Sequence, residues 1–249
     1  MKQGFIIPVY RHGKTVYPLA KKLAASGLPV ILIDDGNDDE NKTYIYKCAG
    51  ETPGVFPVSL KKNLGKGRAL AKGFEKAAEL GLTHVLQVDA DGQHDVTQAA
   101  FFLEESVKNP EKIICGYPEF DKTAPRGRVT GRKISNFWAA VVTFSTELKD
   151  VLCGFRVYPV EPARHIMKYH FLDNRMGFDT EILVRLYWNR VFPVFYPVKI
   201  NYPKDGISNF RMVRDNIRIS WTFSRLFAGM LIRLPLLICL RIKYRKGEK

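Results

Sequence analysis

Two aspartates, separated by one residue, follow an apolar run near the middle of the chain. The run is Val85–Val88, the aspartates are Asp89 and Asp91, and Gly92 and Gln93 come next. A buried strand would deliver both carboxylates to one edge of a sheet, and Gly92 permits a tight turn that returns Gln93 toward the same point. Oxygen ligands of this kind suit Mg²⁺ or Mn²⁺, which keep water and phosphate oxygens as further ligands. The spacing therefore predicts a divalent-cation site that holds the diphosphate of a nucleotide-activated substrate, and the alternative is a solvated loop.

Polar groups also lie near the ends of two other predicted strands. Asp34 and Asp35, with Gly36 behind them, end the second apolar run. A carboxylate there can accept a hydrogen bond from a base N–H or a ribose hydroxyl, or the pair can simply form a turn before a helix. The segment Asn63–Arg68 combines glycines, cations and a helix start, which suits a phosphate group. It lacks the spacing of a Walker A loop, and no GxGxxG motif follows the first strand, which argues against nicotinamide chemistry.

Short apolar runs alternate with helical patterns over the first 120 residues. The expected strands are Phe5–Val9, Pro29–Ile33, Val55–Leu60, His84–Val88 and Lys112–Cys115, and the expected helices are Lys14–Ser26, Asn41–Ala49, Gly67–Glu79 and Val96–Lys108. Further on we expect a long helix, a turn leading into a strand, another helix and a hairpin-like stretch, at Arg126–Glu147, Asp150–Arg156, Gly177–Tyr187 and Val194–Tyr202. This order predicts an α/β fold with a mostly parallel sheet covered by helices on both faces. Ligands of such folds bind at the carboxyl ends of the strands.

The charge of the chain is concentrated at its end. The 249 residues are 46% hydrophobic and 26% charged, a globular composition long enough for one good core. Of the net charge of +14, the stretch from Lys199 onward supplies +9, with 12 lysines and arginines against three acids. Four cysteines without a CxxC pair predict reduced packing residues, and no signal-peptide pattern opens the chain.

This cationic tail has helical periodicity. A basic stripe opposite an apolar face is typical of a helix lying in an anionic membrane surface, so we predict a peripheral anchor. The alternative is a helix packed on the rest of the chain with solvated arginines. The stretch Leu226–Leu240 contains Arg233 and is short for a transmembrane span. The stripe is Arg211, Arg214, Arg218, Arg225 and Arg233, and the apolar face is Val213, Ile217, Phe223, Phe227, Leu231, Leu234 and Ile238.

Several motifs occur in a fixed order along the chain. They are Ile7-Pro8-Val9-Tyr10, Ile33-Asp34-Asp35-Gly36, Asn63-Leu64-Gly65-Lys66-Gly67 with Ala69-Leu70, Asp89-Ala90-Asp91-Gly92-Gln93-His94, Gly154-Phe155-Arg156, Gly177-Phe178-Asp179-Thr180-Glu181 and Gly206-Ile207-Ser208. Together they resemble the family 2 glycosyltransferases with a GT-A fold, and most of all the polyprenyl-phosphate sugar synthases of the dolichyl-phosphate mannose synthase type. With the tail, the resemblance predicts a GT-A domain over residues 1–209 and a membrane-associating segment over 210–249.

The resemblance implies which residues bind the donor and its metal. The site of a nucleotide-diphosphate sugar would comprise Pro8, Tyr10, Asp35, Lys66, Asp89 and Ala90. Mg²⁺ or Mn²⁺ would be held by Asp89, Asp91 and Gln93, with Asp91 counted among the catalytic residues. Contacts of the Asp35 type serve both bases, so UDP and GDP remain alternatives.

The resemblance also implies an acceptor site. Arg132 and Ser135, at the head of the predicted long helix, match positions that meet the acceptor's phosphate in the lipid-phosphate branch. The chain departs from the family pattern in ways that leave the donor and the acceptor class open. The departures are Arg11-His12, Asn37, Lys204 and Asn209, with Arg211 or Arg214 standing in for a missing arginine.

These observations predict a metal-dependent glycosyltransferase that acts on a lipid-linked acceptor at the cytosolic face of a membrane, with inversion implied by the family. A lipid phosphate is already ionised and needs no general base, whereas a lipid or polyene hydroxyl needs a carboxylate to take its proton. Asp179 is the candidate base and is counted with the catalytic residues, although an acid there can also simply favour a helix start.

Two other classes of protein remain as alternatives. A sugar nucleotidyltransferase would want a glycine-rich cationic loop directly after the first strand, and Tyr10–Gly13 is a poor match. A basic module that binds membranes or nucleic acid is the non-enzymatic alternative. Aromatic residues are not interleaved with the arginines in a stacking pattern, so we expect no nucleic-acid partner.

Overall fold

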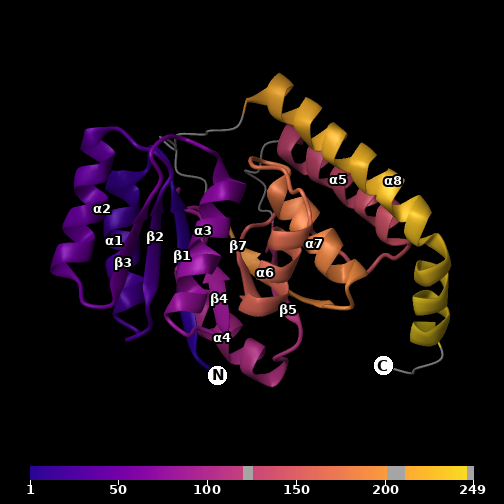
Figure 1. Ribbon diagram of the computed structural model, residues 1–249, viewed down its shortest axis with the longest axis horizontal. Coiled ribbons are helices and arrows are strands. Elements are labelled where there is room, and N and C mark those ends of the chain that lie inside the picture. Colours follow the sequence, from indigo (N-terminus) through magenta and orange to yellow (C-terminus); the bar gives the residue numbers. More distant parts are fainter. Residues whose placement is uncertain (120–125, 201–210, 246–249) are drawn as a thin grey trace.

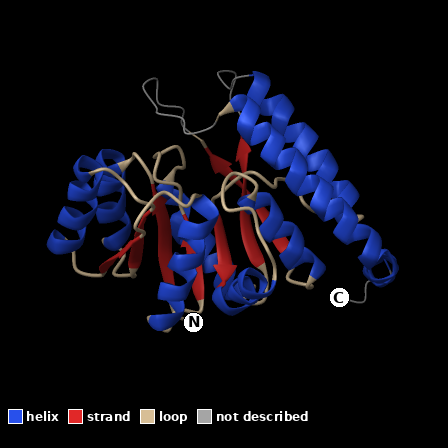
Figure 2. Cartoon of the chain, turned by 45° about the horizontal axis from the view of Figure 1, so that its top comes forward, coloured by secondary structure: helices blue, strands red, loops and turns tan. Residues whose placement is uncertain are grey.

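The computed structural model describes residues 1–119, 126–200 and 211–245, which form one mixed β-sheet with helices on both faces (Figures 1 and 2). The strands are β1 (Gln3–Val9), β2 (Val30–Asp34), β3 (Val55–Ser59), β4 (His84–Gln87), β5 (Ile113–Glu119), β6 (Arg156–Pro159) and β7 (Pro193–Lys199). The helices are α1 (Gly13–Ala24), α2 (Asp39–Glu51), α3 (Lys66–Glu79), α4 (Ala99–Lys108), α5 (Arg126–Thr143), α6 (Val160–Tyr169), α7 (Phe178–Trp188) and α8 (Met212–Arg245), with a 3-10 turn η1 at Val96–Gln98.

The sheet has seven strands in the order β3-β2-β1-β4-β6-β5-β7. All neighbouring pairs are parallel except those of β6, which runs antiparallel to both β4 and β5. The predicted α/β fold with a mostly parallel sheet is therefore confirmed. The interior strand β2 is buried along its whole length, as a strand covered on both faces must be.

The core lies in two layers, one on each face of the sheet. Strand β1 shows the division, because its side chains alternate between the faces. Phe5 and Ile7 belong to the layer under α1, α2 and α4, whereas Ile6 belongs to the layer under α3, α5, α6, α7 and α8. The helices on both faces hold the strand ends in place, and these ends position the candidate site.

Some boundaries differ from the sequence-based expectations. Helix α5 ends at Thr143 rather than at Glu147, because Phe144 adopts a left-handed backbone conformation with φ of 54°. The hairpin expected from Val194 is wrong for the described residues, since β7 is a single strand that pairs in parallel with β5. Helix α6 was not predicted.

Helix α8 lies along the outside of α5 and also contacts α7 (Figure 1). Its side chains Phe223, Leu226 and Met230 are buried against the rest of the chain. On its outer side, Trp221 is 65% exposed and Ile232 is 81% exposed. The tail therefore packs on the rest of the described molecule and keeps an apolar outer face.

Both sequence-based interpretations assumed that all arginines of the tail point into solvent. The structure differs from this assumption. Arg225 reaches the carboxylate of Glu181 at 2.7 Å, and the guanidinium of Arg233 lies 4.9 Å from the ring centroid of Trp188. The expectation of a fully outward basic stripe is wrong for these two residues, because a buried carboxylate and an aromatic face on α7 attract them.

Candidate active site at the carboxyl edge of the sheet

The carboxyl ends of β1, β2 and β4 lie at one edge of the sheet, as the parallel pairing requires. Tyr10 follows β1, Asp35 follows β2, and Asp89 follows β4. The N–H of Asp35 donates to the carbonyl of Val9 at 3.0 Å, which ties the ends of β1 and β2 together. The structure thus gathers the predicted donor residues at the expected edge.

The ammonium group of Lys66 joins two carboxylates that come from different elements. Its Nζ lies 2.7 Å from Oδ1 of Asp89 at the end of β4 and 2.6 Å from Oδ2 of Asp179 at the start of α7. Burial alone would lower the pKa of Lys66, but the two carboxylates outweigh it and raise this pKa well above its usual value. Lys66 is therefore a permanent cation within the site.

A polar network lies beneath Asp179. Nε2 of Gln87 donates to Oδ1 of Asp179 at 2.9 Å, and Nη1 of Arg156 donates to the backbone carbonyl of Asp179 at 2.6 Å. Both oxygens of the Asp179 carboxylate thus accept hydrogen bonds, one from Lys66 and one from Gln87. The network holds Asp179 in one orientation.

The two aspartates of the Asp-x-Asp motif differ in their pKa values. Burial and the nearby charge of Asp89 raise the pKa of Asp91 above its usual value. Burial acts on Asp89 in the same direction, but the cation of Lys66 outweighs it and lowers the pKa of Asp89. Oδ1 of Asp91 also accepts the N–H of Gln93 at 3.0 Å across a turn at Gly92, whose φ is 70°. This is the tight turn that the glycine predicted.

The oxygen ligands that Asp89 and Asp91 offer fit a hard divalent cation that binds together with phosphate. Asp89 and Asp91 offer carboxylate oxygens, and burial together with the charge of Asp89 raises the pKa of Asp91, a cost that a bound cation would relieve. No group of three or more His, Cys, Asp or Glu side chains placed to hold a metal occurs in the described residues. The two carboxylates leave room for water and phosphate oxygens, which Mg²⁺ and Mn²⁺ keep as further ligands.

Asp35 is held by the glycine-containing segment before α3. Its oxygens accept the N–H groups of Leu64 at 2.8 Å and Gly65 at 2.9 Å, and Nδ2 of Asn63 at 3.0 Å. Burial nevertheless raises the pKa of Asp35. Gly65 has φ of 97°, and a Cβ there would lie 2.4 Å from the carbonyl oxygen of Asn174, so only glycine fits. The contacts of Asp35 place the predicted ribose and phosphate neighbours side by side.

The predicted acceptor residues lie on α5. Nη1 of Arg132 contacts both carboxylate oxygens of Asp150 at 2.6 Å, and Ser135 is buried. Asp150 also accepts the N–H of Cys153, whose Sγ lies 3.7 Å from Nε2 of the buried His94. A continuous set of contacts therefore links Arg132 to the motif that carries Asp89 and Asp91.

The other predicted site residues lie at β1, between the two aspartates and before α8. Pro8 is half-buried in β1, the ring of Tyr10 lies beneath Arg11, and Ala90 is buried between the two aspartates. Arg211 is exposed just before α8, where its N–H donates to Asp215. The motif at 206–208, with Lys204 and Asn209, lies outside the described residues.

Sequence reasoning missed two side chains that complete the site. Gln87 interrupts the apolar run before Asp89, and this polar residue within a buried strand was the available signal. Arg156 is fully buried, and its contact with Asp179 could not be read from the motif alone. Gly154 also has a definite role, because a Cβ there would lie 2.7 Å from Oδ2 of Asp89.

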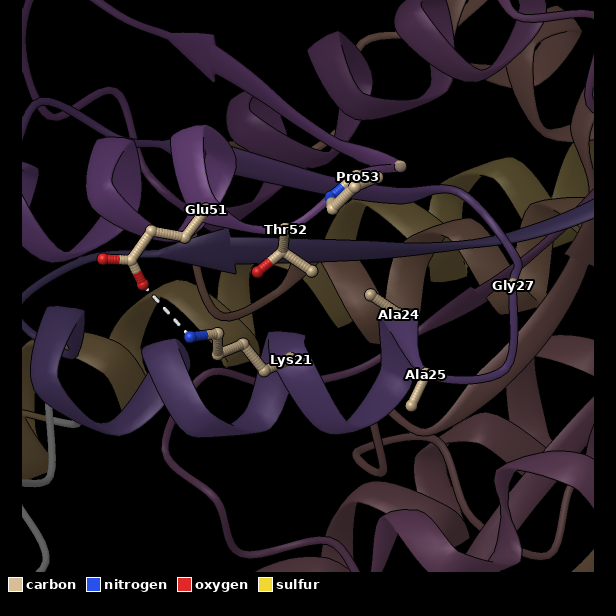
Figure 3. Close-up of a pocket in the computed structure, with 8 residues that line it drawn as sticks. Lys21, Ala24, Ala25, Gly27, Glu51, Thr52 and Pro53 are labelled. Atoms are coloured by element: carbon tan, nitrogen blue, oxygen red, sulfur yellow. Dashed lines mark hydrogen bonds and ion pairs between the residues drawn. The ribbon is translucent and has the colours of Figure 1, made fainter.

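A shallow surface depression lies elsewhere, between the carboxyl ends of α1 and α2 (Figure 3). The residues that line this depression precede β2 and β3. The depression therefore lies at the amino edge of the sheet, opposite Asp89 and Asp91. An exposed ion pair between Lys21 and Glu51 is its main polar feature. We therefore assign no catalytic role to this depression, which is lined by Lys21, Ala24, Ala25, Gly27, Glu51, Thr52, Pro53 and Gly54.

Comparison with known proteins identifies relatives of this site. The family model described as Glycosyl transferase family 2 matches residues 5–167. The dolichyl-phosphate beta-glucosyltransferase of Dictyostelium discoideum is 28% identical over 221 residues, which are 82% of this chain and 66% of that protein. The undecaprenyl-phosphate mannosyltransferase of Micrococcus luteus is 25% identical over 190 residues, which are 72% of this chain and 75% of that protein. The chain thus spans less than two thirds of the Dictyostelium relative.

Solved structures agree on the fold. TarS of S. aureus, residues 1–349 in complex with UDP-GlcNAc, superposes with a TM-score of 0.59 at 15% identity and covers 93% of this chain and 67% of that one. At this identity the likeness concerns the fold, which is of the GT-A type.

Proposed function

The chain belongs to glycosyl transferase family 2, and from this premise we propose that it transfers a sugar from a nucleotide-diphosphate donor to a polyprenyl phosphate at the cytosolic face of a membrane. The observation that carries the choice of acceptor is the engagement of both Asp179 oxygens, by Lys66 and by Gln87. Lys66 and Gln87 already occupy a lone pair on each of these oxygens, which leaves fewer sites on the carboxylate to which a hydroxyl acceptor could pass its proton. A phosphate acceptor is ionised in advance and needs no such base.

The donor binds where β1, β2 and β4 end. Asp35, Tyr10 and Pro8 lie beside the base and ribose, and Asp89, Asp91 and Gln93 would hold Mg²⁺ or Mn²⁺ next to the diphosphate. The cation, when bound, neutralises charge on the departing diphosphate. The raised pKa of Asp91, which burial and the nearby charge of Asp89 cause, supports this arrangement.

The reaction is a single displacement. An oxygen of the lipid phosphate attacks the anomeric carbon, the bond between that carbon and the donor's diphosphate breaks, and the nucleoside diphosphate leaves. The configuration at the anomeric carbon is inverted. Lys66 keeps a positive charge beside the aspartates throughout, and this fixed cation stabilises the charge that develops on the leaving group.

The acceptor approaches from the side of α5. Arg132 is oriented by Asp150, and Ser135 lies one turn further along the helix. Two relatives are named as a dolichyl-phosphate glucosyltransferase and an undecaprenyl-phosphate mannosyltransferase, and these names support a lipid phosphate as the acceptor class.

The outer side of α5 and α8 supports membrane association. One helix among the described residues, Val213–Cys239, has the length and composition of a membrane span, with a mean hydropathy of 1.5. Since Phe223, Leu226 and Met230 of α8 pack on the domain, we place this helix on the bilayer surface rather than across it. We call the exposed apolar side chains the outer apolar face, which comprises Ile134, Phe137, Trp138, Val213, Ile217, Trp221, Leu231 and Ile232.

The test compares acceptors and nucleotides directly. The full chain, with Mn²⁺ and a panel of UDP- and GDP-sugars, is offered a polyprenyl phosphate and the matching polyprenol, and lipid products are followed by mass spectrometry. We expect transfer to the phosphate and none to the alcohol. Transfer to the alcohol would replace the acceptor class, and consumption of a nucleoside triphosphate with release of pyrophosphate would identify a nucleotidyltransferase instead.

A further inference from the structure

Glu181 of α7 is a buried anion that joins α8 to the candidate site. Its side chain has no exposed surface. Oε1 accepts Nε and Nη2 of Arg185 at 3.0 and 2.8 Å, while Oε2 accepts Nη2 of Arg225 at 2.7 Å and the N–H of Asp173 at 2.9 Å. A fully buried carboxylate must be paired, and here two arginines from different helices pair with it.

The segment 173–177 before α7 is organised by the same contacts. Oδ2 of Asp173 accepts the N–H groups of Arg175 at 3.1 Å and Gly177 at 2.9 Å, which closes the segment into a turn. The guanidinium of Arg218, a second arginine of α8, lies 3.9 Å from Oδ1 of Asp173. Helix α8 thus holds this turn at two points, through Glu181 and through Asp173.

The turn at 173–177 packs directly against the segment that carries Lys66. The carbonyl of Asn174 accepts the N–H of Gly67 at 2.8 Å. A Cβ at Gly67 would lie 2.5 Å from the carbonyl oxygen of Asp173, so the two backbones are in close contact. The segment 65–67 donates to Asp35 from its first residue and bridges Asp89 and Asp179 through Lys66.

We propose that Arg225 and Glu181 are positioning residues for the donor site, so that α8 is a working part of the catalytic domain and not a detachable anchor. Through the turn at 173–177, their ion pair sets the position of Gly65, Lys66 and Gly67 relative to the donor's diphosphate. The inference rests on the proposed function for the identity of that ligand. It replaces the expected boundary between residues 1–209 and 210–249 by one continuous catalytic unit.

The test replaces Arg225 in the full chain. Arg225→Met leaves Arg185 to neutralise Glu181, so the fold has a remaining partner for the buried charge. The matched control is Arg164→Met, which removes the arginine of another Arg–Glu pair, that with Glu161 on the surface of α6. Arg225→Lys restores the positive charge without the planar guanidinium.

Two readouts separate the inference from the proposed function. The first is the Kd for UDP and for GDP with Mn²⁺, by calorimetry. We expect Arg225→Met to raise the Kd for the nucleotide that binds by about tenfold, which is about 1.4 kcal/mol. Arg164→Met should bind as the wild type does, and Arg225→Lys should recover part of the loss.

The second readout is hydrogen exchange of the amides of Gly65 and Gly67, which requires no nucleotide. Both amides should exchange faster in Arg225→Met and at the wild-type rate in Arg164→Met. If neither nucleotide binds to the wild type, the proposed function fails, while this readout still decides the inference. Unchanged exchange at these two amides overturns it, as does a general rise across α7 and α8 with unchanged Kd. If Arg225→Met does not fold, Arg225→Gln provides the same comparison.

Discussion

Lys66 and Asp179 form an ion pair of 2.6 Å between residues that lie 113 positions apart in the chain. The pair joins the start of α3 to the start of α7, and Asp89 at the end of β4 completes it from the other side. This arrangement places one fixed cation among the carboxylates at the carboxyl edge of the sheet.

Lys66→Met is expected to lower kcat/KM by about 10²- to 10³-fold, the size of effect seen when one preorganised electrostatic group is removed. Lys66→Arg keeps the charge and should retain more activity. Steady-state kinetics with a saturating acceptor measures both. Wild-type kinetics in Lys66→Met would mean that the cation serves only the fold.

Asp91→Asn is expected to abolish most turnover while the protein stays folded. One of two close negative charges disappears, so the melting temperature should stay the same or rise, because burial and the charge of Asp89 both raise the pKa of Asp91 and thus disfavour its ionised form in the folded state. The loss of activity should exceed about 100-fold, the upper range for outer partners of a metal ion. The Mn²⁺-dependent part of the thermal shift by UDP or GDP should vanish with it. A variant that keeps this shift would show that Asp91 does not face the metal.

Asp179→Asn separates the two acceptor classes. With a phosphate acceptor, the variant loses an ion pair but no proton acceptor, so we expect a loss smaller than about 10²-fold. The dependence of kcat/KM on pH should keep its shape. If the acidic limb of the wild-type profile disappears in the variant, Asp179 takes a proton and a hydroxyl acceptor becomes the better assignment.

The outer apolar face should bind membranes with little dependence on charge. Trp221→Ser combined with Ile232→Ser removes two side chains whose burial is each worth about 1.5–3 kcal/mol, so partitioning into vesicles should fall by about 100-fold or more. Cosedimentation with neutral phosphatidylcholine vesicles measures this. Binding of the wild type should persist in about 1 M salt, where the Debye length is only about 3 Å. Binding that needs anionic lipid and disappears in salt would instead indicate the remaining outward arginines as the contact.

Acid should destabilise the protein partly through His84. Burial lowers the pKa of His84 below its usual 6.5, so the unfolded chain binds this proton more tightly than the folded protein does. Its contribution to the free energy of unfolding is therefore complete above the unfolded pKa and falls as the pH drops below it. The slope for one group is at most about 1.4 kcal/mol per pH unit.

The measurement is urea unfolding of the wild type and of His84→Gln at several values between about pH 7 and pH 5. The wild type should lose stability more steeply than the variant over this interval. Equal slopes would mean that His84 has the same proton affinity in both states.

Local patterns were sufficient to predict the fold and the edge of the sheet at which the candidate site lies. Apolar runs ending in Asp35 and Asp89 predicted the strands, because a side chain's burial in a parallel sheet depends mainly on its own strand. The rule that ligands gather at strand ends then placed these carboxylates at one edge. The turn at Gly92 also followed from the residue itself, since glycine adopts positive φ without strain.

Partners from distant elements could not be predicted in this way. The sequence indicated Lys66 as a phosphate neighbour and Asp179 as a possible base, but only the packing of α3 against α7 shows that each is the other's partner. Gln87 and Arg156 meet the same carboxylate from β4 and β6, which pair in the antiparallel direction that no local pattern disclosed.

Helix α8 shows the same difference between what local sequence determines and what tertiary packing determines. Its amphipathic periodicity is a property of the sequence, and so is its ability to form a long helix. Which face of α8 turns inward depends on the side chains that the neighbouring helix presents. The buried carboxylate of Glu181 on α7 pairs with Arg225, so this side of α8 faces the protein. Sequence alone therefore determined that α8 has two unlike faces, whereas tertiary structure decided which face meets the protein, because an unpaired buried charge costs more free energy than exposing apolar side chains to the surroundings.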